Sequence, residues 1–180
     1  MNKITISLGT LSGLLLLAGF LGPLAGTDFS HLSPEDYNQG ESLGYGVMLL
    51  AAAGASVAMV VVSRRNAEAG FGQLIKTGLA TAVVTTLVFY VGNVIFYRWI
   101  APDFLGHFMD AFAVNKAKTI TDEAKRAAYL AGMESDKTLY TNPFLYSGIM
   151  AGTVFMICLM PVAVFGYILF RIRNRRRTVQ

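Results

Sequence analysis

Four long stretches of this chain contain no Asp, Glu, Lys, Arg or His, and they limit what it can fold into more than any other feature. A helix needs about 20 apolar residues to cross the roughly 30 Å hydrocarbon core of a bilayer, and each stretch is long enough to supply them. The sequence therefore predicts an all-α membrane protein with four transmembrane helices. The stretches are Ile4 to Thr27, Ser42 to Ser63, Thr77 to Tyr97 and Leu139 to Phe170.

The composition agrees with a membrane protein, because 54% of the residues are hydrophobic and only 14% are charged. We expect a single membrane domain over residues 1–180. The first apolar run is longer than the core of a secretory signal, so we expect it to be retained as a span. Cys158 is the only cysteine, which excludes a disulfide within the chain. The expected spans are about 4–25, 43–63, 77–100 and 143–170, with an outer helical loop at 101–142.

The distribution of Lys and Arg predicts the orientation. With four spans, Lys3, the link between the second and third spans, and the C-terminal tail fall on one side, which the positive-inside rule assigns to the cytoplasm. The opposite side carries the loop 28–41, which has acids and no Lys or Arg. We therefore expect a multi-pass membrane protein with both termini in the cytoplasm.

The C-terminal tail accounts for most of the net charge of +4. Arg residues that directly follow a span act as a stop-transfer signal and bind anionic lipid headgroups. The tail lacks the interleaved aromatic residues that single-strand binders use, so we expect lipid and no nucleic acid as its partner. The Arg residues are Arg171, Arg173, Arg175, Arg176 and Arg177.

The long outer loop contains an amphipathic pattern. Its apolar residues recur at a helical spacing that places them on one side of a helix, which predicts an interfacial helix at the outer membrane surface. A second, Ala-rich helix with mixed charges is expected over Thr121 to Met133, exposed to water. The apolar residues of the first helix are Phe104, Leu105, Phe108, Met109 and Phe112.

Three segments in this order resemble a bacterial family of small four-span inner-membrane proteins that is catalogued as a domain of unknown function. They are Gly70 to Gly78 (GFGQLIKTG), Tyr97 through Ala101-Pro102-Asp103-Phe104, and Asn142-Pro143-Phe144. The resemblance extends roughly from Glu41 to Arg173. It implies a four-helix bundle and supplies no catalytic residues.

The third span carries a stripe of polar residues on one helical face, at i, i+4, i+7 and i+11. These side chains could line a path for water or a small molecule, or they could bond to neighbouring helices. We favour packing, because a neutral stripe cannot by itself relay protons or hold a cation. The residues are Thr86, Tyr90, Asn93 and Tyr97.

Imidazole and carboxylate groups in the two outer loops could bind a divalent metal such as zinc. Asp103, His107 and Asp110 share a helical spacing, and His31 lies between acids in the first outer loop. Charged faces of surface helices are usually just solvated, so we expect neither a metal site nor a cofactor.

Small residues indicate where helices come close. Gly148 and Gly152 form a small-xxx-small motif in the last span, and Ala51 and Ala55 lie on one side of the second. We expect these residues to pack within the bundle, with self-association as the alternative.

No span carries a nucleophile beside a base, an HExxH motif or a cluster of acids, so an enzyme is not expected. The sequence favours a non-catalytic accessory or interaction component with a protein partner or a second copy as its contact. The alternative is a small oligomeric transporter or channel that uses the polar face of the third span.

Overall fold

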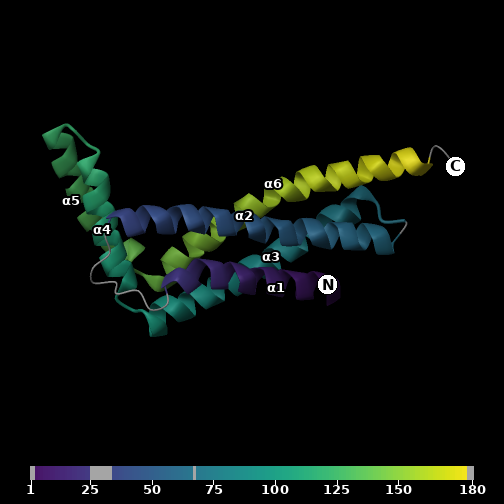
Figure 1. The fold of residues 1–180 in the computed structure, drawn as a ribbon, viewed down its shortest axis with the longest axis horizontal. Coiled ribbons are helices and arrows are strands. Elements are labelled where there is room, and N and C mark those ends of the chain that lie inside the picture. The colour runs from purple at the N-terminus through teal and green to yellow at the C-terminus, as the bar shows by residue number, and fades with distance from the viewer. Residues whose placement is uncertain (1–2, 25–33, 67, 178–180) are drawn as a thin grey trace.

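The computed structural model describes residues 3–24, 34–66 and 68–177. These residues form helices and contain no strand, so the all-α prediction is confirmed (Figure 1). Four helices are long and apolar enough to cross a membrane, and the chain is a multi-pass membrane protein. Their apolar spans cover Lys3–Leu24, Gly46–Arg65, Phe71–Ile100 and Pro143–Ile172.

The helices of the bundle extend beyond the predicted spans. The first consists of α1 (Lys3–Leu21) and the short turn η1 (Gly22–Leu24), and the second is α2 (Pro34–Arg65). The third is α3 (Phe71–Ile95) with a terminal π-helical turn η3 (Phe96–Ile100), and the last is α6 (Pro143–Arg177). Residues 34–45 continue the second span as helix, so α2 begins at Pro34, well before the apolar part of the span.

Helices α2 and α3 form the centre of the bundle, because they contact each other and both of the remaining spans. Figure 1 shows both ends of the chain and the α2–α3 turn at one end of the molecule. The turn is tight: the Asn66 side chain accepts a bond from the Glu68 backbone N–H at 2.9 Å, and α3 starts directly after Gly70. Pro161 lies inside α6, and Figure 1 shows the two halves of this helix running in different directions.

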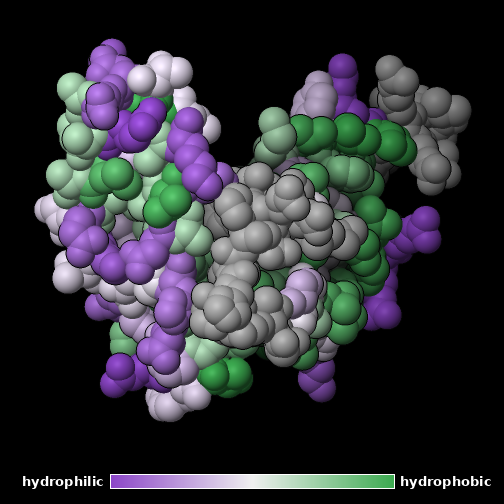
Figure 2. Space-filling model, turned by 60° about the vertical axis from the view of Figure 1, so that its left-hand side comes forward, coloured by the Kyte–Doolittle hydropathy of each residue, from purple (hydrophilic) through white to green (hydrophobic). Residues whose placement is uncertain are grey.

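The opposite end carries two further helices, α4 (Phe104–Lys118) and α5 (Glu123–Tyr140), which form a hairpin. The helix expected at the start of this loop is present as α4 and lies at the end of the bundle opposite the α2–α3 turn, while its position at a membrane surface stays a prediction. Phe104, Leu105 and Met109 are buried there, whereas α5 has no buried residue. In Figure 2 hydrophilic residues gather over the hairpin and hydrophobic residues over the membrane helices.

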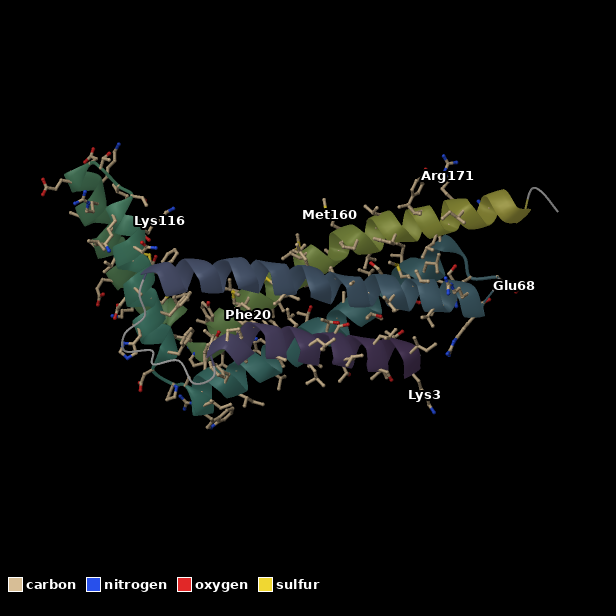
Figure 3. All side chains as sticks on the ribbon, in the orientation of Figure 1. Lys3, Phe20, Glu68, Lys116, Met160 and Arg171 are labelled. Carbon is tan, nitrogen blue, oxygen red and sulfur yellow. The ribbon has the colours of Figure 1, made fainter. Side chains whose placement is uncertain are left out.

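The core of the bundle is apolar and lies between all four spans. Leu16 of α1, Met48 of α2, Phe89 of α3 and Val154 of α6 are each at most 2% exposed and belong to one cluster. The ring of Phe20 packs edge-on against Phe89 at 5.6 Å (Figure 3). This cluster fills the middle of the bundle at the level of the polar stripe of α3.

Candidate functional site

The polar face of α3 turns toward the interior of the bundle. Asn93 is fully buried and Tyr97 is 1% exposed, while Thr86 and Tyr90 are half-buried. Asn93 donates from Nδ2 to the backbone oxygen of Phe89, one turn earlier, at 2.9 Å. This bond stays within α3, so Nδ2 of Asn93 is satisfied without a partner from another helix.

Two oxygens of this face have no hydrogen-bond partner among the described residues. They are Oγ1 of Thr86 and Oδ1 of Asn93, and a third such atom is Oγ of Ser147 in α6. Ser147 is fully buried. The sequence alone does not indicate Ser147, because one Ser in an apolar span carries no periodic signal. Ser147 is relevant to the polar face because the register of α6 against α3 places it at the level of Asn93.

An aromatic cluster closes the outer end of this face. The ring of Tyr97 stacks on Phe104 of α4 with centroids 5.5 Å apart, and it meets Tyr146 of α6 edge-on at 5.5 Å. Phe104 in turn stacks on Phe108 at 5.4 Å. Tyr97 is therefore a core residue and not a member of an interfacial aromatic belt, whereas Trp99 is 68% exposed.

The π-helical turn η3 carries Tyr97, which belongs to this aromatic cluster. The backbone N–H of Ala101 donates to the oxygen of Phe96 at 2.8 Å, which closes the wider turn. Such turns re-aim side chains at the end of a helix. Phe96 and Tyr97 are buried here, and Trp99 and Ile100 are exposed.

A family model of proteins of unknown function, DUF4199, matches residues 7–171. The chain belongs to this family. The match includes the first span, which lies before the segments that carried the resemblance. Neither the curated proteins nor the solved structures give a match. Membership in DUF4199 therefore fits a membrane protein of four spans and assigns no chemistry to the polar face.

The small-residue motif of α6 in this DUF4199 protein faces outward. Gly148 and Gly152 are exposed, and a Cβ added at either would meet nothing within 4 Å. Ala55 is 1% exposed and packs with Met59 and Val162, as expected for a bundle contact. Ala51 lies within α2, but its side chain is outside the described part of the structure.

A close approach of α1 to α3 uses a different pair of glycines. A Cβ added at Gly9 would lie 2.7 Å from Cβ of Val84, and one at Gly13 would lie 2.6 Å from Cβ of Val88. Thr85 also donates from Oγ1 to the backbone oxygen of Gly9 at 3.2 Å. Gly9 and Gly13 have the same spacing as the α6 motif, so the pattern was available in the sequence, but which glycine pair faces a neighbour was not.

Salt bridges and caps hold the α4–α5 hairpin together. Asp110 of α4 pairs with Nζ of Lys137 in α5 at 2.7 Å. Arg126 donates from Nε and Nη2 to the backbone oxygen of Ile120 at 3.0 and 2.8 Å, and Asp122 caps α5 by accepting from the Lys125 N–H. The hydrogen bond to Asp110 raises the pKa of Lys137.

The candidate metal ligands do not assemble. Within the residues that the structure describes, no group of three or more His, Cys, Asp or Glu side chains could hold a metal ion. Asp103, His107 and Asp110 lie along α4, where Asp110 pairs with Lys137. His31 lies outside the described residues.

Proposed function

We propose that this protein is a non-catalytic interaction component of a bacterial inner membrane, and that its α4–α5 hairpin is the surface that contacts a partner protein. The observation that carries this proposal is the contrast between the two helices of the hairpin. Helix α4 is fixed to the bundle through buried Phe104 and Leu105, whereas α5 has no buried residue. In this proposal the bundle, through α4, holds α5 outside the membrane.

The face of α5 that points away from α4 has small side chains and carries no charge. The half-buried residues of α5 follow a helical spacing that marks the side toward α4. They are Arg126, Tyr129, Met133, Lys137 and Tyr140. The opposite side has small, exposed residues at the same spacing, which let another helix approach closely. These residues, which we name the alanine face, are Ala124, Ala128, Ala131 and Ser135.

The orientation that this function needs follows from charge. Lys3, Glu68 and Arg171 lie at one end of the molecule and Lys116 at the other (Figure 3). The positive-inside rule assigns the end with Lys3, Arg64, Arg65 and the Arg tail to the cytoplasm, which would place α5 in the periplasm. Anionic headgroups at the inner leaflet are the proposed partner of the tail, where Arg171 lies 5.7 Å from the Tyr167 ring centroid.

The burial of the polar face supports this proposal over a transporter or channel. A path for solutes would need a continuous column of water past Asn93, which is fully buried and bonded within its own helix. Neutral side chains there also offer no charge to a cation.

Site-specific photo-crosslinking in native membranes tests the proposal. A photoreactive residue at position 131 should crosslink to one protein, and Ala128→Arg should abolish that product because a long cation blocks close helix approach. Asp136→Arg is the matched control, since position 136 is also exposed on α5 but lies off the alanine face. Crosslinks that survive Ala128→Arg, or none from position 131, would contradict the proposed contact surface.

A further inference from the structure

Two fully buried polar side chains lie on the neighbouring helices α3 and α6, with no hydrogen bond between them. Asn93 of α3 and Ser147 of α6 are each 0% exposed. Oδ1 of Asn93 and Oγ of Ser147 both lack a hydrogen-bond partner. Buried polar atoms in native proteins are nearly always paired, with protein or with ordered water.

The register of the two antiparallel helices places these residues at the same level. Toward the cytoplasmic end, a Cβ at Gly78 would touch Val162. Phe89 and Ala151 share the central core cluster, and the rings of Tyr97 and Tyr146 are 5.5 Å apart toward the outer end. Asn93 and Ser147 each fall between these last two levels, one helical turn from residues that contact the opposite helix.

We propose that one buried water molecule bridges Oδ1 of Asn93 and Oγ of Ser147 and so joins α3 to α6. The Asn93 amide is oriented by its bond from Nδ2 to the oxygen of Phe89, which leaves Oδ1 as an acceptor only. The bridging group must therefore donate a hydrogen bond to Asn93. Water can do so while it donates to or accepts from the Ser147 hydroxyl, and two polar partners are enough for a buried water.

A cation does not fit the same position. Both groups are neutral, and the apolar stretches of the third and fourth spans contain no Asp or Glu to balance a charge. The water would lie about one helical turn from the Tyr97–Tyr146 contact, toward the middle of the bundle. It would therefore fix the ends of α3 and α6 against which α4 packs. This inference concerns the bundle and does not depend on the proposed partner of α5.

A double-mutant cycle on the full chain in detergent micelles tests the bridge by thermal unfolding. Ser147→Ala should lower Tm by about 2–4 °C, because the water loses a partner. In an Asn93→Leu background, Ser147→Ala should no longer lower Tm; Asn93→Ala replaces Asn93→Leu if that variant does not fold. If Oγ is simply unpaired, Ser147→Ala removes a desolvation penalty and raises Tm, which would overturn the proposal.

Thr86→Val is the matched control. Oγ1 of Thr86 is also buried and unpartnered, but the register places Val154 of α6 at its level. Thr86→Val should therefore leave Tm unchanged or raise it. A loss of Tm equal to that of Ser147→Ala would show that any hydroxyl in this core is stabilising, and would contradict a specific bridge.

A structure at a resolution that shows ordered water separates the bridge from a direct bond, which would give the same coupling. The proposal expects an oxygen peak within about 3.2 Å of both Oδ1 and Oγ. Direct contact between the two side-chain oxygens, with no third atom between them, would overturn it.

Discussion

The ring of Tyr97 in α3 stacks on the ring of Phe104 in α4, with centroids 5.5 Å apart and planes 15° apart. Both side chains are at most 3% exposed. This contact joins the membrane bundle to the outer hairpin, so the position of α5 depends on it.

Removing the Phe104 ring should release the hairpin. Phe104→Ala leaves a cavity against Tyr97 and should lower the free energy of unfolding by about 3–5 kcal/mol. Limited proteolysis should then cut within 104–140 faster than in the wild type. Trp99→Ala is the control, because Trp99 is 68% exposed and its loss should change stability by less than about 0.5 kcal/mol. Equal effects of the two variants would contradict the anchoring role of Phe104.

Glycine-to-alanine substitutions should affect stability differently in the two small-residue motifs. Gly13→Ala places a Cβ 2.6 Å from Cβ of Val88 and 2.9 Å from the backbone oxygen of Thr85, so α1 must move away from α3. We expect a loss of about 1–3 kcal/mol in thermal unfolding in detergent. Gly152→Ala meets nothing within 4 Å and should gain up to about 1 kcal/mol from helix propensity.

The same pair of variants bears on self-association. If the outward motif of α6 packed against a second copy, Gly152→Ala would weaken dimers in a crosslinking assay. The interior role of Gly13 predicts that only Gly13→Ala disturbs the monomer fold. Destabilisation by Gly152→Ala with Gly13→Ala neutral would contradict the observed helix faces.

The Asp110–Lys137 pair should show a dependence on alkaline pH. The hydrogen bond to Asp110 raises the pKa of Lys137 above its ordinary value of 10.5. A raised lysine pKa gives stabilisation that is fully present below that ordinary value and is lost as pH rises through the raised pKa. The Tm difference between wild type and Asp110→Asn should therefore shrink above about pH 10.5.

Titration of Lys137 by NMR checks the cause directly. Asp110→Asn should lower the Lys137 pKa toward its ordinary value, whereas Glu134→Gln should have a smaller effect, since its carboxylate lies 3.9 Å away instead of 2.7 Å. An unchanged pKa in Asp110→Asn would show that the pair does not form in solution.

Membrane orientation is checked by single-cysteine labelling in a Cys158→Ala background. A cysteine at position 125 in α5 should react with an impermeant thiol reagent added from the periplasmic side, because the positive-inside rule predicts a cytoplasmic basic end. A cysteine at position 68, in the α2–α3 turn, should be protected from that side. The reverse pattern would place both termini outside the cytoplasm.

The number of spans could be predicted from sequence because a charge-free stretch long enough to cross lipid has few alternative structures. Which face of each helix points inward could not be read in the same way. Helices α1, α3 and α6 are apolar on nearly all sides, since lipid and core accept the same residues. Hence Gly9 and Gly13 face α3 while Gly148 and Gly152 face outward, although both pairs have the same spacing.

The candidate site was only partly visible in the sequence for a related reason. The polar stripe of α3 has a helical period, and this showed that Asn93 and Tyr97 share a face. The contribution of Ser147 depends on the register of α6 against α3, and the stacking of Tyr97 on Phe104 depends on the turn at Phe96–Ile100. Contacts between segments far apart in the chain leave no local pattern.

The measurement that most directly tests the account is the reactivity of a cysteine at position 93 in a Cys158→Ala background. Asn93 is fully buried in a bundle whose polar face we interpret as packing, and we propose that the α4–α5 hairpin carries the function. We predict that Asn93→Cys is protected from water-soluble thiol reagents in folded protein, whereas Lys125→Cys reacts rapidly. Modification at position 93 at the rate of position 125 would show an open water path and contradict the account.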